Sequence, residues 1–320
     1  MTRIAVWGLG PHAFKNILPA IGESNVLELA GVVSRSEEKV ADAIARWGTK
    51  RWRTPEEMLS DASVDAVYVT TPTGLHFEHG MLVLGAGKHL ICEKSLTASP
   101  TQSLALVAEA RSRALVICEA LMFQYHPRIE AIRSIIRDPA FGRSLHAFAS
   151  FGLPPLAQPG FRGNADLGGG AFLDVACYTL CLARALFGHA PRVLHANIRS
   201  ASGESVDTAG DAALLFDSGT RADVTWGYNR AYTAEMTIIG EGGSVYANRL
   251  FAKDTPLDSV IIRRDRSGAA SALQVASASA FAGMFEVVSA ATTDSAARER
   301  LYDSAEGQAR LMRDVSVCAR

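Results

Sequence analysis

Over about the first 120 residues, short apolar runs alternate with segments of helical spacing, and no other feature restricts the fold as strongly. Each run is short enough for a buried strand, and the segments between place apolar residues three or four positions apart. Strands joined by helical crossovers form a parallel sheet with both faces covered. We therefore expect an α/β domain over residues 1–120. Its predicted strands are Arg3–Trp7, Leu27–Ser34, Ala66–Thr70, His89–Cys92 and Val116–Glu119, and its predicted helices are Ala13–Ile21, Glu37–Trp47, His76–Leu84 and Thr101–Arg111.

The second part of the chain changes to a two-residue hydrophobic period. In Arg221–Tyr228 every second residue from Ala222 onward is apolar, which predicts an antiparallel strand with one buried face. A helix predicted at Gly170–Phe187 is apolar nearly all round, so we expect it to be buried. Residues 121–320 are therefore predicted to form an α+β domain. Its other predicted elements are strands at Leu145–Phe151, Val193–Arg199, Asp211–Phe216, Met236–Gly240, Gly243–Tyr246 and Val260–Arg264, and helices at Pro127–Arg137 and Ala305–Val317.

The charge balance argues against a nucleic-acid or membrane partner. Lys and Arg total 32 and Asp and Glu total 33, so the net charge is -1, whereas polyanions attract basic proteins. No apolar stretch approaches the ~20 residues of a membrane span, and the first strand leads into a glycine turn and not a signal peptide. The five cysteines form no CxxC pair, and the histidines show no ligand spacing. We therefore expect a cytoplasmic protein without disulfides or a metal.

A glycine-rich turn follows the first predicted strand. The segment Gly8-Leu9-Gly10-Pro11-His12-Ala13 fits the pattern GxGxxG/A and stands between a strand and a helix, as the pattern requires. Gly8 permits a tight turn, Gly10 lets the backbone approach a diphosphate, and the small Ala13 lets helix and strand pack closely. The diphosphate would then lie on the helix N-terminus. The turn predicts dinucleotide binding, and an ordinary strand–helix turn is the alternative.

The end of the second predicted strand indicates which dinucleotide binds. NAD-preferring sites carry Asp or Glu there to bond the ribose 2′-hydroxyl, but this chain has Ser34 and Arg35. A hydroxyl and a guanidinium suit a 2′-phosphate, and neither replaces the missing carboxylate. We therefore expect NADP(H). A solvated loop arginine is the alternative interpretation of Arg35.

The next two predicted strands end in further candidate cofactor contacts. Thr71, Pro72 and His76 follow one of them, and Glu93 and Lys94 follow the other. Ligands of open parallel sheets collect beyond the carboxyl ends of the strands, so both turns should border one crevice. An ammonium there could polarise a carbonyl and supply a proton, which makes Lys94 a candidate catalytic residue. The alternative interpretations are that His76 is a helix-start or core histidine, and that Lys94 is an ordinary surface lysine.

Three successive glycines, residues 168–170, precede the helix that we expect to be buried. Such a run suits a place where the backbone closely approaches a ligand or another chain segment. Asp174 and Tyr178 follow at a spacing of four residues, so they project from one helix face. A carboxylate and a phenol on an apolar helix need a partner if buried, or a ligand if they line a cleft. Asp174 is equally explained as a first-turn residue favoured by the helix dipole.

Together these motifs resemble the glucose–fructose oxidoreductase/inositol dehydrogenase (Gfo/Idh/MocA) family along nearly the whole chain. The resemblance implies a Rossmann domain followed by a domain with a large, open, mostly antiparallel sheet and flanking helices. It also implies hydride transfer between a pyridine nucleotide and a sugar, cyclitol or diol. Because that sheet commonly forms the family's subunit interface, we expect a homo-oligomer, either a dimer or a tetramer. The resemblance rests on Gly8-Leu9-Gly10, Thr71-Pro72 with His76, Glu93-Lys94, and Gly168-Gly169-Gly170-Ala171-Phe172-Leu173-Asp174 with Tyr178.

Within the family, the chain is most similar to the branch that reduces 3-keto groups of nucleotide-linked deoxysugars. The similarity implies that Lys94 is the proton donor and that Tyr178 lies close to it. It also implies that Arg162 and Asp174 contact the cofactor. The substrate is expected to meet Tyr232 together with Lys94, Asp174 and Tyr178. The segments that carry this similarity are Phe151–Leu156, Phe161-Arg162, Tyr228–Tyr232 and Asn248–Phe251.

Two departures from the family pattern affect the expected chemistry. Ser95 stands where a proline normally follows the Glu-Lys pair, which is expected to loosen that turn. Tyr178 stands where many inositol-type members carry histidine, so the acid–base role moves toward Lys94 and Tyr178. Dihydrodiol or aldose dehydrogenases of the same family are one alternative, since the dihydrodiol type shares both residues. A non-enzymatic NADPH-binding redox regulator is another alternative, and such a protein would not need both Lys94 and Tyr178.

Overall fold

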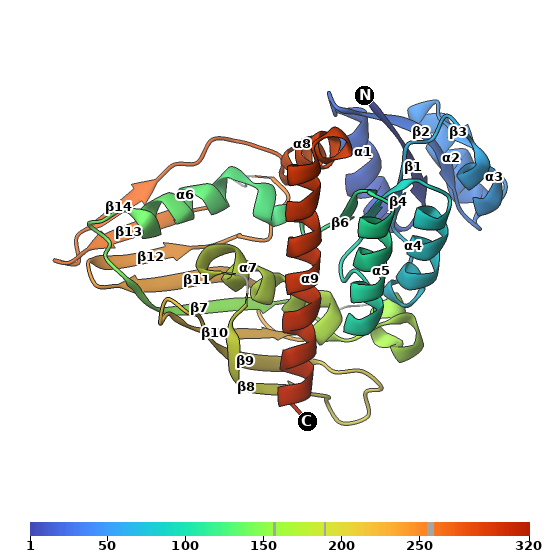
Figure 1. Ribbon diagram of the computed structural model, residues 1–320. Coiled ribbons are helices and arrows are strands. Elements are labelled where there is room, and N and C mark those ends of the chain that lie inside the picture. The colour runs from blue at the N-terminus through green and yellow to red at the C-terminus, as the bar shows by residue number, and fades with distance from the viewer. Residues whose placement is uncertain (156–157, 189, 255–258) are drawn as a thin grey trace. The chain divides into compact units, whose positions relative to one another are not determined.

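The chain forms two compact units in the computed structural model, which describes residues 1–155, 158–188, 190–254 and 259–320 (Figure 1). The first unit comprises Met1–Ala120 and Phe281–Ala309, and the second comprises Leu121–Ala280 and Arg310–Arg320. The periodicity of the sequence assigns all of residues 121–320 to one domain, whereas the structure groups Phe281–Ala309 with the first unit. Leu156, part of one segment similar to the ketoreductase branch, lies outside the described residues.

The first unit contains a six-stranded sheet in which every strand pair is parallel. Its order, β3-β2-β1-β4-β5-β6, is that of doubly wound dinucleotide-binding folds. The predicted parallel α/β sheet is therefore confirmed. The strands are β1 (Thr2–Trp7), β2 (Leu27–Val33), β3 (Lys50–Arg51), β4 (Ala66–Val69), β5 (His89–Cys92) and β6 (Ile117–Glu119), and the helices between them are α1 (Leu18–Gly22), α2 (Glu37–Trp47), α3 (Pro55–Ser60), α4 (His76–Gly85) and α5 (Pro100–Ser112).

Local signals explain the helix boundaries, and short length explains the elements that sequence analysis missed. At the start of α2 the Ser36 side chain accepts a hydrogen bond from the Lys39 amide, and Gly48 ends the helix with a φ of 61°. The first helix begins with a π-helical segment, Ala13–Ile17, before α1. Strand β3 has 2 residues and α3 has 6, which is too short for a hydrophobic period to show.

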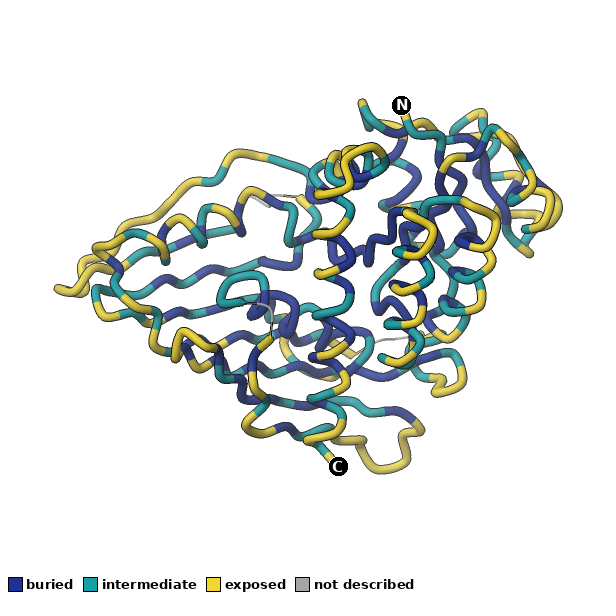
Figure 2. The backbone as a smooth tube through the Cα atoms, viewed as in Figure 1, coloured by how far each residue is buried: buried dark blue, intermediate teal, exposed yellow. Residues whose placement is uncertain are grey.

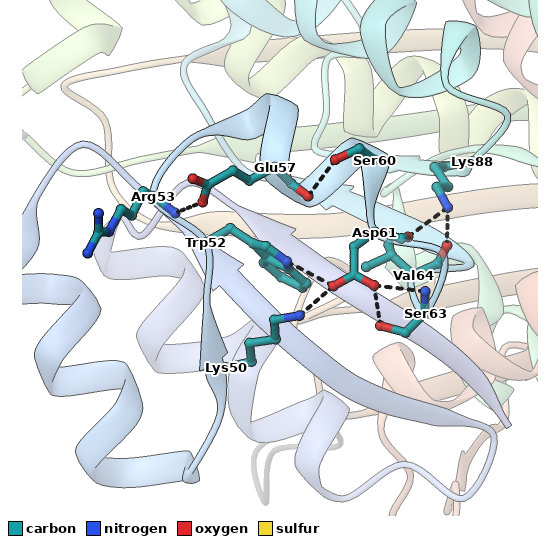
Figure 3. A network of polar contacts seen from close by, with 9 residues as sticks. All are labelled: Lys50, Trp52, Arg53, Glu57, Ser60, Asp61, Ser63, Val64 and Lys88. Atoms are coloured by element: carbon teal, nitrogen blue, oxygen red, sulfur yellow. Dashed lines mark hydrogen bonds and ion pairs between the residues drawn. The ribbon is translucent and has the colours of Figure 1, made fainter.

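A polar network around Asp61 fixes the end of α3 and the edge of this sheet (Figure 3). The Asp61 carboxylate accepts hydrogen bonds from the Lys50 ammonium, from the Trp52 indole at 3.1 Å, and from the Ser63 hydroxyl at 2.6 Å and amide at 2.8 Å. The Lys50 hydrogen bond and those from Ser63 hold the pKa of Asp61 well below its usual value. A side chain at Gly31 would overlap the Trp52 ring, which explains a glycine inside β2.

Helix α8 (Ala280–Thr293) and the first part of α9 (Ser295–Cys318) pack in the first unit through specific side chains. Phe285 is fully buried, edge-on to Tyr68, at a ring-centroid distance of 6.5 Å. Tyr302 donates a hydrogen bond to the Leu115 carbonyl at 2.6 Å, and Arg111 pairs with Glu306 at 2.9 Å. Of these two helices the sequence predicts only Ala305–Val317 within α9, and α8 was not predicted.

The second unit is built on an eight-stranded sheet of order β14-β13-β12-β11-β7-β10-β9-β8. All its pairs are antiparallel except β7 with β10, which confirms the expected open, mostly antiparallel sheet. Strand β14 consists of exposed residues and escaped prediction. The strands are β7 (Ser144–Gly152), β8 (Arg192–Arg199), β9 (Ala209–Leu215), β10 (Arg221–Gly227), β11 (Thr233–Gly240), β12 (Gly243–Ala247), β13 (Ile261–Asp265) and β14 (Ala270–Leu273), and the helices are α6 (Pro127–Arg137) and α7 (Cys177–Phe187).

The two faces of the second sheet differ as the alternating pattern predicts (Figure 2). In β10, Ala222, Val224 and Trp226 are buried, while the residues between them are exposed or half-buried. The α7 region lies in the core on that buried side, with a π-helical segment, Phe172–Ala176, at its start. The stretch Ala165–Phe187 is long and apolar enough to cross a membrane, but 72% of its most apolar window is buried inside the structure, as in a core helix.

Candidate functional site

The strand register brings the four predicted cofactor turns to one edge of the first sheet. Trp7 pairs with Val33 in β2 and with Val69 in β4, and Val69 pairs with Cys92 in β5. The next residues along each strand therefore leave the sheet at the same level. These residues are Gly8, Ser34, Thr70 and Glu93.

The glycine turn after β1 has the geometry that a diphosphate requires. Gly8 has a φ of 105°, and a Cβ there would lie 3.0 Å from the Thr70 hydroxyl oxygen, so only glycine fits. A Cβ at Gly10 would meet nothing within 4 Å, so nothing in the chain excludes a side chain there. Ala13 is fully buried, as close packing of helix and strand requires. The open space beside Gly10 at a helix start fits a bound dinucleotide.

His12 joins this turn to the turn after β5. Its Nε2 lies 3.0 Å from the Glu93 carboxylate, and the Tyr68 hydroxyl donates to the same carboxylate oxygen at 3.0 Å. Burial opposes ionisation of Glu93, but His12, Lys94 and Tyr68 outweigh it and lower the pKa of Glu93. Glu93 is therefore an ionised group that ties two candidate cofactor turns together.

His76 is buried, with only 1% of its surface exposed. Its Nδ1 lies 2.9 Å from the Ser95 carbonyl and its Nε2 lies 2.7 Å from the Thr71 carbonyl. Burial lowers the pKa of His76, although these carbonyls favour the charged ring. The imidazole thus links the turn that carries Thr71 and Pro72 to the turn that carries Lys94.

The other candidates of the first unit lie at the ends of β2 and β5. Ser34 is half-buried and Arg35 is exposed immediately after β2, where a ribose 2′-substituent binds in folds of this type. Lys94 is half-buried, two residues beyond the end of β5, and the Lys94–Ser95 peptide bond is cis. Among the residues that the structure describes, no group of three or more His, Cys, Asp or Glu is placed to hold a metal ion.

In the second unit the three glycines pack against the chain itself. A Cβ at Gly169 would lie 2.5 Å from the Arg162 carbonyl oxygen, and one at Gly170, where φ is 111°, would overlap the Asp207 carboxylate. Asp207 accepts a hydrogen bond from the Phe172 amide at 2.7 Å and so caps the start of the following helix. Burial raises the pKa of Asp207 to about 6. Sequence analysis missed Asp207, because one acidic residue in a polar loop carries no signal.

Asp174 lies in a polar network with Arg162 and Tyr228. Arg162 Nε donates to its carboxylate at 2.7 Å, and the Tyr228 hydroxyl lies 3.1 Å from the same oxygen and 3.2 Å from the Gly170 carbonyl. Burial opposes the charge on Arg162, but Asp174 outweighs it and raises the pKa of the guanidinium. Burial and Asp174 together raise the pKa of Tyr228. The structure therefore joins Arg162 and Asp174, which the sequence predicted at the cofactor, and adds Tyr228.

Tyr178, one turn further along the helix, is held by three aromatic rings. Its ring centroid lies 5.2 Å from that of Phe151, 5.3 Å from Phe251 and 5.7 Å from Phe123. Tyr232 is 42% exposed, and the Arg249 guanidinium lies 5.0 Å from its ring centroid.

A parallel sheet with a glycine turn where its strand order reverses, followed by a unit with a large antiparallel sheet, defines a class of dinucleotide-binding oxidoreductases. Residues 2–120 match the oxidoreductase family with an NAD-binding Rossmann fold, and residues 129–246 match the GFO/IDH/MocA C-terminal domain. The chain belongs to the Gfo/Idh/MocA family of oxidoreductases. The family, the fold and the enzyme class predicted from the sequence are thereby confirmed.

Two curated relatives illustrate the chemistry found in this family. The dTDP-3,4-didehydro-2,6-dideoxy-alpha-D-glucose 3-reductase of Streptomyces violaceoruber is 37% identical over 252 residues, which cover 78% of this chain and 73% of the relative. Human trans-1,2-dihydrobenzene-1,2-diol dehydrogenase is 35% identical over 139 residues, 43% of this chain and 41% of that enzyme.

A solved 3-ketoreductase from Actinomadura kijaniata, in complex with NADP and TDP-benzene, has the same fold. Its TM-score is 0.93 at 29% identity, and the match covers 100% of this chain and 98% of that one. The same reductase has been solved with a lysine replaced by alanine and with a tyrosine replaced by phenylalanine. These complexes support the expected cofactor, NADP(H).

Proposed function

We propose that this protein is an NADPH-dependent ketoreductase that acts on a keto group of a nucleotide-linked deoxysugar. The observation that carries the proposal is its likeness, over the whole chain, to a 3-ketoreductase that binds NADP and a TDP-linked ligand. The relative of 37% identity reduces a sugar of this class. The groups that we propose for binding in this chain are the glycine turn, the polar end of β2 and the Asp174 network.

The first unit supplies the cofactor-binding groups in this proposal. Ser34 and Arg35 bind the 2′-phosphate, and the Gly8–Ala13 turn binds the diphosphate. The turns that contain Thr71, Pro72 and Glu93 border the rest of the cofactor, with His12 and His76 as their internal links. Arg162 and Asp174 contact the cofactor from the second unit.

The chemistry requires a hydride donor and a proton donor. NADPH supplies the hydride when bound, and negative charge develops on the ketone oxygen as the carbon is reduced. Lys94 and Tyr178 act on that oxygen: the ammonium stabilises the charge, and one of the two groups donates the proton. Tyr232 contacts the sugar. The Phe123, Phe151 and Phe251 rings hold the Tyr178 ring and limit its motion.

The relatives give one specific reason to choose this lysine and this tyrosine. The lysine and the tyrosine replaced in the solved reductase are separated by the same number of residues as Lys94 and Tyr178. Position along the strand agrees with the assignment, since Lys94 follows β5 at the edge of the sheet where the other cofactor turns lie.

The experiment is replacement of Lys94 by Met, with Lys39→Met on the exposed face of α2 as the matched control. Lys94→Met is expected to lower kcat by about 10²–10⁴-fold, the contribution of a general acid, with the Kd for NADPH within about threefold of wild type. Tyr178→Phe is expected to lower kcat as well. Near-normal turnover in Lys94→Met would refute its catalytic role.

A dihydrodiol or aldose dehydrogenase is the second candidate, favoured by the likeness to the human diol dehydrogenase. Initial rates with keto-sugar nucleotides, free aldoses and trans-dihydrodiols distinguish the two. The proposal predicts a kcat/KM for the nucleotide sugar at least about a hundredfold higher, because a bound nucleotide adds binding energy that a free sugar lacks. Cofactor binding without turnover of any of them would favour a redox regulator.

We also propose that two copies of the chain associate through the outer face of the second sheet. Phe148 and Ile239 are exposed there, at 45% and 42%. A hollow of about 420 Å³ between β7, β9, β10 and β11 is lined by both apolar and charged groups, including Asp211, Arg221 and Glu235. Phe148→Glu should give monomers in sedimentation equilibrium, whereas Leu82→Glu, equally exposed in the first unit, should not. A monomeric wild-type protein would contradict this proposal.

A further inference from the structure

A buried arginine on α6 holds a distant segment of the second unit. Arg128 is only 1% exposed, and its guanidinium donates to the carbonyls of Arg249 at 2.7 Å, Ala252 at 2.8 Å and Asp254 at 3.3 Å. It also donates to the Ser259 hydroxyl at 3.0 Å. One side chain thus fixes four points between residues 249 and 259.

This arrangement is costly, because the guanidinium hydrogen-bonds to carbonyl and hydroxyl oxygens of this segment and to no carboxylate oxygen among the described residues. A buried cation without an ion-pair partner loses its hydration and regains only part of it from neutral acceptors. Its buried Nε finds no hydrogen-bond partner in the described part of the chain. Burial accordingly lowers the pKa of Arg128 to about 10.

The segment held by Arg128 carries two residues that contact the tyrosines proposed to meet the substrate. Phe251 packs on Tyr178, with ring centroids 5.3 Å apart, and Arg249 lies over the ring of Tyr232. Arg249 has a φ of 52°, a conformation that a non-glycine residue keeps only when its surroundings enforce it. The hydrogen bond from Arg128 to the Arg249 carbonyl supplies such enforcement.

We infer that Arg128 is a positioning residue for substrate: by fixing Arg249–Asp254 it holds Phe251 against Tyr178 and Arg249 over Tyr232. The inference rests on the proposed function, because it takes Tyr178 and Tyr232 as the groups that meet the sugar. Arg128 acts through the backbone carbonyls that it binds and does not itself contact the ligand. Arg128 therefore sets how well the keto sugar is bound and aligned, and it is not one of the groups proposed to bind NADPH.

The test compares Arg128→Lys with two matched changes on the same helix. Arg133, like Arg128, donates to a backbone carbonyl, in its case from Nε to Ala185, but it lies outside the proposed site, so Arg133→Lys should keep KM and kcat within about twofold. Ile132 is buried in the hydrophobic core of the second unit, so Ile132→Ala should lower the unfolding midpoint without changing KM. Arg128→Lys should raise KM for the keto sugar about tenfold or more and lower kcat, with an unchanged Kd for NADPH.

Amide hydrogen exchange gives a readout that does not depend on turnover. In the NADPH-bound enzyme, Arg128→Lys should accelerate exchange in residues 249–254, whereas Ile132→Ala should not do so selectively. If Arg128→Lys loses stability but keeps KM and the exchange of this segment, the role is structural only and the inference is wrong. If that variant does not fold, Phe251→Leu and Arg249→Met must each raise KM, and an unchanged KM in either variant overturns the inference.

Failure of this inference is separable from failure of the proposed function. If the wild-type protein reduces no nucleotide-linked keto sugar, the proposed function fails, and KM is then measured with the sugar or diol that it does convert. If the wild type reduces the keto sugar and Arg128→Lys binds it normally, the proposed function stands and only the positioning role falls.

Discussion

Replacing Gly170 by alanine should destabilise the second unit strongly, for two reasons that the structure separates. The residue has a φ of 111°, which costs an L-amino acid about 1–3 kcal/mol. The new methyl group would also overlap the Asp207 carboxylate and displace it from the Phe172 amide, a helix cap worth about 0.5–2 kcal/mol. The sum, about 1.5–5 kcal/mol, is a large part of a typical folding free energy.

The assay is urea unfolding followed by circular dichroism, with Gly219→Ala as the matched control. Gly219 has a φ of 83° in the turn between β9 and β10, but a Cβ there meets nothing within 4 Å. Its substitution should therefore cost only the backbone strain, about 1–2 kcal/mol. If Gly170→Ala is no more destabilising than Gly219→Ala, the contact with Asp207 is not what requires a glycine.

Two further predictions concern Asp207 and the cofactor. The folded-state pKa of Asp207 is raised to about 6 from 3.8, so the folded chain binds more protons than the unfolded chain between these values, and stability falls as pH rises through this window. Because asparagine stays neutral, the unfolding free energy of Asp207→Asn relative to wild type should increase by up to about 3 kcal/mol between pH 4 and pH 7. Thermal unfolding across pH measures this difference, and a difference that does not change with pH contradicts the burial argument. Arg35→Ala should weaken NADPH binding about tenfold or more and leave NADH binding nearly unchanged, measured by fluorescence titration, because only NADPH carries the 2′-phosphate. If the substitution weakened the binding of NADPH and NADH equally, Arg35 would not contact the 2′-phosphate.

Sequence periodicity predicts most strands and helices well where they are long and half-buried. Glu37–Trp47, His89–Cys92 and Pro127–Arg137 agree with the structure at both ends. Strand β14 was not predicted, because all its residues are exposed and no alternation of apolar and polar residues marks it. Helix α8 was not predicted from the sequence, and only Ala305–Val317 of α9 was.

The candidate site divides in a similar way. The glycine turn could be predicted because its backbone requirement is local, and the structure shows the φ of Gly8 that requires it. The roles of Asp207 and Arg128 could not be predicted, because they depend on packing against segments far along the chain. The triple glycine allowed two interpretations, and in the structure Gly169 and Gly170 pack against other chain segments.

The most direct test of the proposed activity follows a labelled hydrogen. The purified protein is incubated with NADPH deuterated at the transferable position and with dTDP-3,4-didehydro-2,6-dideoxy-α-D-glucose, and the sugar product is examined by mass spectrometry and NMR. One deuterium is expected at the former 3-keto carbon for each NADPH oxidised, and Lys94→Met is expected to slow this transfer by about 10²–10⁴-fold. Tight NADPH binding without any deuterium in the sugar, under conditions where the Streptomyces violaceoruber reductase transfers it, would contradict the proposal.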